Sequence, residues 1–384
     1  MLDNHHVDGH WYFYFSDWGC ASPSPACLSH QTVMMRVTVS LPPRAPHANF
    51  VLSGAAGCRQ VDCCENSGPW PTNQCFQCCP LQKNSACTYN TNHTIVAWRT
   101  ANFTVWEPLG VLISPEERAT GTVFVPRVMH NRATSQYVMW FENYITGGGS
   151  AGEYSVAVSK TAAGPWTLVR DRQPSPSAAK HSANFTCGGS QGDFDVFVDD
   201  DGRAYIVNTY YSWFCIEELS PDYLGGTGRT ARVTAMDPQI KGHPDGDEAP
   251  TLFKRHGLYY LTYASGCCGC KGGSVTWQHT SRSPLGPWTV DGVLLTPTGP
   301  VTRAQQRAVF TVPGAGGELQ WIHLGNQWVP GNGGEGTCSN GGLLYWWPLH
   351  FAANGSIVPI TKFEDNVQFE LSTGDAQTAQ SLEQ

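Results

Sequence analysis

The sequence predicts an all-β fold, a five-bladed β-propeller with a cysteine-rich loop insertion. Three observations predict it: the composition, a repeated aromatic strand and the spacing of that repeat. The 384 residues include 41 glycines, 26 prolines and 14 tryptophans, and only 14% are charged. Such a chain supplies turns and aromatic strands and is poor in the Glu, Lys and Ala that fill helices. We therefore expect short strands joined by tight turns.

An aromatic-rich strand that follows a polar or glycine turn occurs five times. The five segments span residues 9–15, 135–141, 202–207, 257–263 and 317–324. From Tyr137 the strands recur at Tyr205, Tyr259 and Trp321, at separations of 68, 54 and 62 residues, which suits a four-stranded blade with loops. The first interval, from Trp11 to Tyr137, is 126 residues long and must contain an insertion.

Residues 54–90 are the predicted insertion. They carry seven cysteines among Gly, Pro, Asn and Gln and almost no apolar periodicity, as expected of a loop held by disulfides. The chain has 15 cysteines in all, so one is left over from pairing within it. Structural zinc is the competing interpretation, but adjacent cysteines do not match the Cys-x-x-Cys spacing of zinc sites. The cysteines instead indicate an oxidising compartment.

Four Asn-x-Ser/Thr sites agree with a secreted glycoprotein, at Asn92, Asn102, Asn184 and Asn354. The chain has no stretch of about 18 apolar residues. Its first residues also lack the basic and apolar regions of a secretory signal. Because residues 11–16 already have the pattern of a core strand, we expect the sequence to be truncated or to begin late.

We expect one catalytic domain over residues 1–363 and a polar tail without strand patterning over residues 364–384. The formal net charge is −8 and no Lys/Arg cluster occurs, which argues against nucleic acid or an anionic membrane as a partner. A neutral polysaccharide or oligosaccharide fits better. We expect a monomer.

A second repeated unit is Gly-Pro-Trp-Thr, which begins at Gly164 and again at Gly286. In both places a strand pattern ends in a polar turn just before the unit. One copy would be an ordinary β-turn, but two copies at one place in a repeat indicate equivalent turns. We predict that each Gly-Pro pair starts the next strand.

Glu248 is the first candidate for chemistry. It lies in Gly-Asp-Glu-Ala-Pro, ahead of the aromatic strand at 258–263. An acid just before such a strand could lie in a wall of low dielectric that raises its pKa, as a proton donor near neutral pH requires. The alternative is a solvated loop glutamate.

Asp193 and Asp195 form a second acidic group. They lie two residues apart beside an apolar strand pattern and should therefore share one face, where a buried pair must be used or paired. Metal binding and an internal salt bridge explain them equally well. The following Asp-Asp-Asp-Gly, 199–202, predicts a hairpin turn whose acids are solvated, in preference to calcium ligands.

Several motifs in this order and spacing resemble glycoside hydrolase family 43, and within it most closely the exo-β-1,3-galactanase branch. The similarity covers residues 9–360 apart from the insertion. The motifs are the runs at 193–205 and 248–261, the two Gly-Pro-Trp-Thr units, and the segments at 324–328 and 345–349. The resemblance implies a five-bladed propeller that hydrolyses glycosides with inversion.

The resemblance also implies roles for three residues. Glu248 is the general acid, and Asp193, in preference to Asp195, tunes the pKa of that acid and orients it. Most of the family takes its general base from an Asp near the start of the first blade, in a segment that this chain either lacks or has lost upstream of Met1. The galactanase branch instead uses a glutamine that matches Gln305, and a neutral amide can accept a proton only through a water chain or its imidic tautomer. The alternative role for Gln305 is a hydrogen-bonding pocket residue.

The chain departs from the galactanase branch where the branch carries Glu-Arg-Pro-Lys. Here residues 124–127 read Phe-Val-Pro-Arg, so a carboxylate that contacts substrate is absent. Glu142 is the residue that we expect to supply a sugar contact. Trp213, Trp277 and Trp328 are candidate sugar-stacking platforms, with burial in the blade core as the alternative.

The function that we expect is inverting, exo-acting hydrolysis of β-1,3-galactan or arabinogalactan-type glycans by a secreted enzyme. The alternatives are an arabinofuranosidase or xylosidase on the same scaffold, a non-catalytic glycan-binding propeller, and an interaction protein built on the insertion. No cofactor is expected. Calcium at the propeller axis is consistent with the family, although the sequence identifies no ligand set for it.

Overall fold

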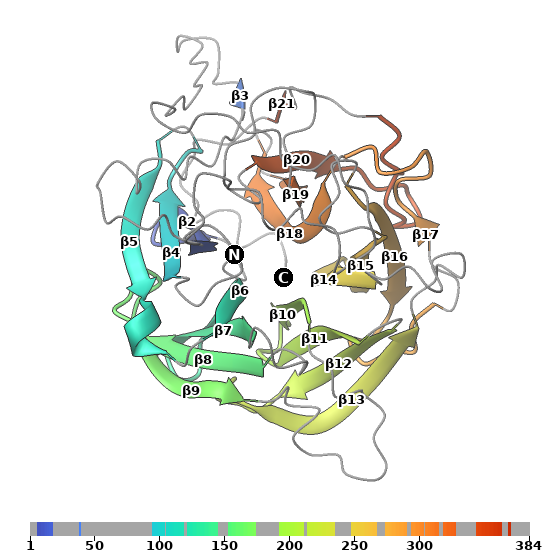
Figure 1. Cartoon of the computed structure of the whole chain (residues 1–384). Helices are drawn as coiled ribbons and strands as arrows, with labels where there is room; N and C mark the ends of the chain where they lie inside the picture. The colour runs from blue at the N-terminus through green and yellow to red at the C-terminus, as the bar shows by residue number, and fades with distance from the viewer. Residues whose placement is uncertain are drawn as a thin grey trace, which may run out of the picture.

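The computed structural model describes an all-β protein in which sheets surround a common centre (Figure 1). Five of these sheets have three or four strands each, and all their strand pairs are antiparallel. This arrangement is that of a β-propeller, as the aromatic repeat predicts. The described residues are 6–17, 38–39, 94–103, 105–118, 121–144, 153–173, 192–210, 213–234, 247–266, 273–289, 293–302, 304–314, 318–327, 343–362 and 368–369.

Within each of the five sheets the strands lie side by side in the order in which they occur along the chain. The first sheet consists of β1 (His6–Val7), β2 (His10–Asp17), β4 (Thr94–Thr100) and β5 (Glu107–Ile113). The second consists of β6 (Thr122–Asn131), β7 (Gln136–Tyr144), β8 (Glu153–Ser159) and β9 (Thr167–Gln173), and the third of β10 (Phe194–Val198), β11 (Ala204–Tyr210), β12 (Trp213–Leu219) and β13 (Gly226–Thr234). The fourth consists of β14 (Asp247–Arg255), β15 (Leu258–Ser265), β16 (Val275–Ser281) and β17 (Val293–Leu294), and the fifth of β18 (Gln305–Pro313), β19 (Leu319–Gln327) and β20 (Leu343–Leu349). A 3-10 turn, Pro115–Glu117, precedes β6.

The five predicted aromatic strands are confirmed, and they all occupy one place in the fold. They are β2, β7, β11, β15 and β19, the second strand of each sheet. The strands before four of them, β6, β10, β14 and β18, lie nearest the centre in Figure 1. Neighbouring members of this inner set contact one another, so they form the wall of the central region.

Hydrophobic side chains fill the space between neighbouring sheets. The described residues form five such clusters, and one of them joins the first sheet to the fifth. In that cluster the ring of Phe13 in β2 meets the ring of Phe310 in β18 edge-on, at a centroid distance of 5.9 Å. Burial of these aromatic rings closes the circle of sheets.

The two Gly-Pro-Trp-Thr units form equivalent turns between the third and fourth strands of their sheets, as predicted, but neither Gly-Pro pair starts the next strand, and β17 begins only at Val293. Thr167 begins β9, and Trp288 forms a bridge with Ser281. Gly164 and Gly286 have φ angles of 97° and 86°, in the region that favours glycine.

The insertion at 54–90 lies outside the described residues. In the predicted tail, β21 (Gln368–Phe369) pairs in parallel with β3 (Thr38–Val39), so the expectation of a tail without strands was wrong at this point. Cys215 of β12 is the one described cysteine; it is buried and disulfide-bonded. Within the described ranges, no helix is long and apolar enough to cross a membrane.

The predicted hairpin turn at 199–202 is confirmed, but its first acid is not solvated. Asp199 is buried and accepts hydrogen bonds from the hydroxyl of Tyr259 (2.5 Å) and from Nζ of Lys254 (2.7 Å). Lys254 also contacts Asp200 at 2.6 Å. Asp199 of the third sheet thus accepts hydrogen bonds from two residues of the fourth, and the cation of Lys254 balances its charge. These charge-assisted bonds stabilise the contact between the two sheets.

We predict that Tyr259→Phe lowers the free energy of unfolding by about 1.5–3 kcal/mol, because Asp199 loses a donor that a buried carboxylate needs. The matched control is Tyr260→Phe, whose hydroxyl donates to the neutral carbonyl of Gly355 and whose loss should cost about 1 kcal/mol. Urea denaturation of both variants measures the difference. An equal loss of unfolding free energy in the two variants would show that the charge of Asp199 does not strengthen the hydrogen bond of Tyr259.

Candidate active site

The three predicted catalytic residues lie at the starts of three inner strands. Asp193 directly precedes β10, Glu248 is the second residue of β14, and Gln305 is the first residue of β18. Nε2 of Gln305 donates to Oε2 of Glu248 at 3.0 Å and lies 3.5 Å from Oδ2 of Asp193. The fold therefore brings together side chains up to 112 positions apart in the sequence.

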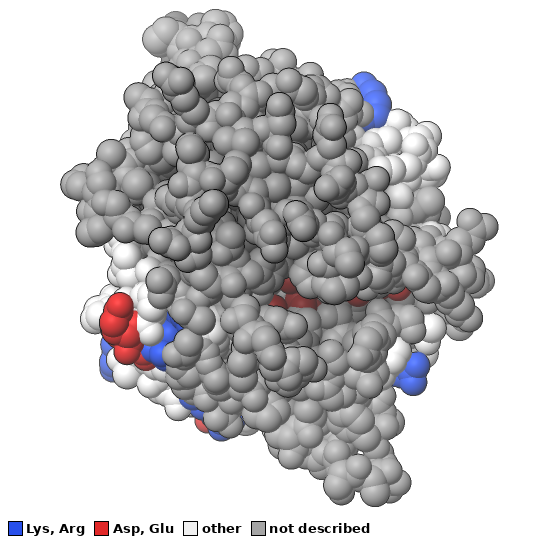
Figure 2. All heavy atoms as spheres, in the orientation of Figure 1, with Lys and Arg blue, Asp and Glu red and all other residues white. Residues whose placement is uncertain are grey.

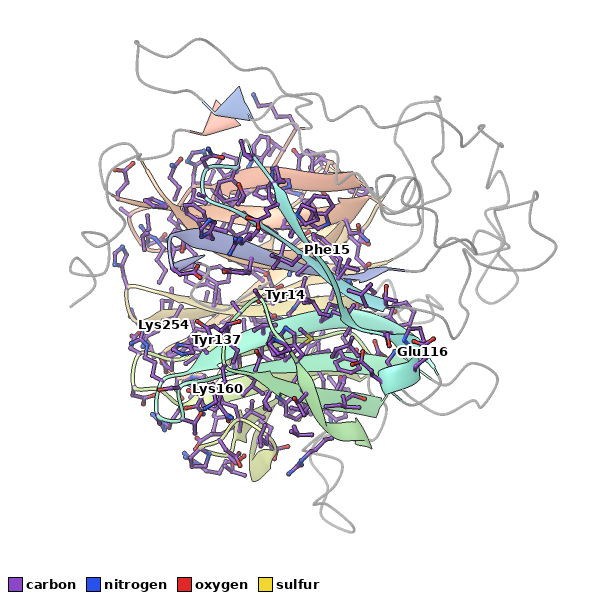
Figure 3. All side chains as sticks on the ribbon, turned by 90° about the vertical axis from the view of Figure 1, so that its left-hand side faces the viewer. Tyr14, Phe15, Glu116, Tyr137, Lys160 and Lys254 are labelled. Atoms are coloured by element: carbon purple, nitrogen blue, oxygen red, sulfur yellow. The ribbon has the colours of Figure 1, made fainter. Side chains whose placement is uncertain are left out.

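The site lies on one face of the ring. Figure 3 shows the ring from the side, with Lys254, near the end of β14, at one edge and Glu116, just ahead of β6, at the other. The starts of the inner strands thus face the side opposite Lys254. Figure 2 shows acidic side chains in a recess near the centre of the ring.

Irregularities at the starts of the inner strands set the direction of these side chains. The pairing of β14 with β15 shifts in register between Glu248 and Thr251, and that of β18 with β19 shifts between Gln306 and Ala308. Such bulges bend a strand and turn its side chains away from the regular alternation. In β14 the residue after Glu248 is Ala249, at φ 50°, followed by a proline.

A buried ion pair lies beneath the site and links the inner strands. Nε of Arg127 in β6 contacts Oδ1 of Asp195 in β10 at 2.8 Å, and the other oxygen of Asp195 accepts the amide of Leu252 in β14 at 3.2 Å. Nη2 of Arg127 donates to the carbonyl of Arg307 in β18 at 2.5 Å. Asp195 is therefore an internal salt-bridge partner, one of the two roles that the sequence left open.

Arg307 connects this lower network to the site. Its Nη1 lies 3.4 Å from Oδ1 of Asp193, so that carboxylate receives a cation on one side and the amide of Gln305 on the other. Sequence reasoning named neither Arg127 nor Arg307. The available signal was an arginine within an otherwise apolar strand pattern, which requires a buried acceptor.

Glu142 lies next to the site on β7 and is buried. Its register partner on β6 is Phe124. Burial raises the pKa of Glu142 well above its ordinary value of 4.5, and the charges of Asp193 and Glu248 raise this pKa further. Glu142 pairs in register with Tyr154, whose hydroxyl donates to the carbonyl of Gly192 at 2.8 Å, next to Asp193; sequence reasoning expected Glu142 to supply a sugar contact.

The raised pKa of Glu142 predicts a pH-dependent cost to stability. In the unfolded chain Glu142 loses its proton near pH 4.5, whereas in the folded protein it keeps the proton up to its higher pKa. Between these two pH values the folded state binds more protons than the unfolded state, so the free energy of unfolding falls as pH rises. Glu142→Gln mimics the protonated acid and removes this loss. We expect the melting temperature of the variant to rise relative to wild type on going from pH 4 to pH 8. A difference that is the same at both pH values would contradict the prediction.

The geometry of Gln305 bears on its role as a base. Its amide nitrogen donates directly to Glu248, which leaves no water between them, whereas an inverting pair needs its groups about 6.5–9.5 Å apart. In this arrangement Gln305 acts as a donor that holds two carboxylates together, which is the alternative role that the sequence allows.

Two of the three candidate stacking tryptophans are packed against other side chains. Trp213 is buried on the third strand of its sheet beneath the guanidinium of Arg232, which lies 4.1 Å from the ring centroid. Trp277 packs against the cluster between the third and fourth sheets. The structure thus places both rings in packing between strands and sheets, the alternative stated above, and Trp328 lies outside the described residues.

Metal ligands do not gather in the described part of the chain. Within those ranges, no group of three or more His, Cys, Asp or Glu residues could hold an ion. The absence of a cofactor and the axial calcium both remain predictions.

The family model of glycosyl hydrolases family 43 matches residues 87–355, more than half of the chain. The chain belongs to glycosyl hydrolases family 43. The resemblance stated from sequence motifs is therefore confirmed. Members of this family are glycosidases.

Solved structures of the family have the same fold. An exo-β-1,3-galactanase from Clostridium thermocellum is similar with a TM-score of 0.57 and 25% identity, over 69% of this chain and 55% of that one. A β-1,3-galactosidase of family 43 bound to galactodeoxynojirimycin has a TM-score of 0.56 and 24% identity, over 73% of this chain and 88% of that one. An exo-β-1,3-galactanase from Phanerochaete chrysosporium, solved with galactose, has a TM-score of 0.54 and 22% identity, over 72% and 58%.

Among curated proteins, the β-D-galactofuranosidase xynD of Aspergillus niger is 31% identical over 98 residues, 25% of this chain and 26% of that protein. The chain thus spans about a quarter of this relative and little more than half of the Clostridium structure.

Proposed function

We propose that this family 43 member is an inverting, exo-acting hydrolase of β-1,3-galactan or of arabinogalactan-type glycans. The observation that supports it most is the hydrogen-bonded cluster of Asp193, Gln305 and Glu248 at the starts of three adjacent inner strands. Galactanases and galactosidases of this family are among the structures with the same fold. We take the five sheets to be the five blades of the propeller.

In this proposal Glu248 protonates the oxygen of the leaving sugar. Asp193 tunes the pKa of Glu248 and orients it, as the family resemblance implies; the amide nitrogen of Gln305 contacts both side chains. Nη1 of Arg307 lies 3.4 Å from Oδ1 of Asp193, so a cation stands beside this carboxylate. The pair then has the separated roles that glycoside hydrolysis requires, one protonated acid and one carboxylate.

The attack of water needs a partner on the opposite face of the ring. Gln305 serves this role when a bound sugar separates its amide from Glu248 and its side-chain oxygen orients the attacking water. The proton of that water leaves along a chain of water molecules or is taken up by the amide as its imidic tautomer. Glu142, protonated by its surroundings, supplies a hydrogen-bond donor to a sugar hydroxyl. The enzyme acts outside the cell as a glycosylated, disulfide-containing monomer without a cofactor.

The substrate is tested by offering the purified protein β-1,3-galactan, galactofuranosides, arabinofuranosides and xylosides in parallel. The proposal predicts galactose released from chain ends of the galactan, with the other substrates cleaved far more slowly. The A. niger relative makes galactofuranosides the most informative competitor. Preferential cleavage of any competitor would overturn the galactan assignment. Binding without cleavage of any of them would favour a non-catalytic glycan-binding protein.

A further inference from the structure

Two inner strands begin with the same local geometry. Phe124-Val-Pro in β6 and Glu248-Ala-Pro in β14 each place a left-handed residue before the proline, Val125 at φ 49° and Ala249 at φ 50°. Both strands then shift in register against their neighbours, between Phe124 and Arg127 and between Glu248 and Thr251. A β-branched valine rarely adopts a positive φ, so the surrounding fold imposes this bend.

The repeated bend makes Phe124 the counterpart of Glu248 in the second sheet. Glu248 reaches the site through its hydrogen bond with Gln305, so an equivalent backbone aims the ring of Phe124 toward the same central region. A second observation agrees. Glu142, the register partner of Phe124, also pairs with Tyr154 on β8, and the hydroxyl of Tyr154 donates to the carbonyl of Gly192, next to Asp193, so this row of residues borders the site.

The burial of Phe124 fits a side chain at the edge of a binding site. Its neighbours Val123 and Val125 are 0% and 2% exposed, whereas Phe124 is only half-buried and packs against the cluster between the second and third sheets. The packing fixes the ring, and the remaining surface is available to a ligand.

We infer that Phe124 is the aromatic platform of this site, against which the C–H face of a pyranose ring stacks while Asp193, Glu248 and Gln305 contact its polar edge. This inference rests on the proposed function. Sugar pockets combine an apolar or aromatic wall with a few placed polar groups, and aromatic rings stack on the C–H face of a sugar. A phenylalanine at this position favours substrates that present an apolar face. A carboxylate at the same position would favour substrates that present a hydroxyl group.

The inference is tested by comparing Phe124→Leu with Phe124→Tyr. Stacking acts equally on bound substrate and transition state, so Phe124→Leu should raise KM roughly tenfold with kcat nearly unchanged, and Phe124→Tyr should retain the KM of wild type. The matched control is Phe15→Leu, a half-buried phenylalanine that packs against the cluster between the first and fifth sheets. Figure 3 labels Phe15 on the strand β2.

Binding of β-1,3-galactobiose to the inactive Glu248→Gln protein, measured by calorimetry, gives the same comparison without turnover. We expect Phe124→Leu in this background to weaken Kd roughly tenfold. An unchanged KM and Kd, or an equal change in Phe15→Leu, would overturn the inference while leaving the proposed function intact. Sugar binding that depends on Phe124 in a protein that hydrolyses nothing would overturn the proposed function alone. No sugar binding at all would overturn both.

Discussion

Glu248→Gln is expected to lower kcat for the hydrolysis of β-1,3-galactobiose by about 10²–10⁴-fold, because the leaving galactose departs slowly as an unprotonated alkoxide. An amide at this position keeps the size of the side chain but has no acidic proton. The same variant should lose less than about tenfold on 4-nitrophenyl galactoside, whose leaving group is stable without protonation. Kinetics on the two substrates measure the contrast.

A matched control is Glu218→Gln on β12. This buried glutamate is paired with Arg229 at 2.7 Å, away from the central strands, and its variant should keep wild-type activity on both substrates. Equal losses of Glu248→Gln on the two substrates would mean that Glu248 does not protonate the leaving group. Its contact with Gln305 would then serve binding.

Arg127→Met is expected to lower the free energy of unfolding by about 3–5 kcal/mol, the largest effect on stability that we predict. The variant leaves the carboxylate of Asp195 buried without its cation, and it also removes a donor to the carbonyl of Arg307. Burial already raises the pKa of Asp195, and the charge of Arg127 opposes that rise. Urea denaturation at neutral pH measures the loss.

The double variant with Asp195→Asn separates charge from packing. If the uncompensated charge causes the loss, then Arg127→Met with Asp195→Asn should be more stable than Arg127→Met alone, because no carboxylate remains to be buried. A double variant that is less stable than the single one would contradict this explanation. The loss of stability in Arg127→Met would then come from the lost packing of the arginine side chain and not from the unpaired charge of Asp195.

The sequence predicts the fold well because the signal is local and repeated. Aromatic strands such as the one at Tyr259 alternate with glycine and polar turns, and the intervals between them match one sheet each. The same logic located the two acids, because Asp193 directly precedes β10 and Glu248 lies at the start of β14. The role of an aromatic residue could not be predicted in this way, because the same sequence pattern fits a blade core and a sugar site. Trp277, for example, packs against the cluster between the third and fourth sheets.

The interior of the site could not be predicted because it depends on contacts between strands far apart in the chain. Arg127 and Asp195 are 68 positions apart, and Arg307 and Asp193 are 114 apart. No local pattern connects such partners. The left-handed bend at Val125 also escapes local propensity, because valine disfavours it and only the surrounding fold imposes it.

The most direct test of the central claim, that the cluster of Asp193, Gln305 and Glu248 is the catalytic centre of an inverting galactan hydrolase, is to follow the first product by proton NMR. Wild-type protein is incubated with β-1,3-galactan beside Glu248→Gln. The account predicts that wild type releases galactose first as the α-anomer and that the variant releases almost none. Galactose that appears first as the β-anomer, equal release by both proteins, or no release by either would contradict it.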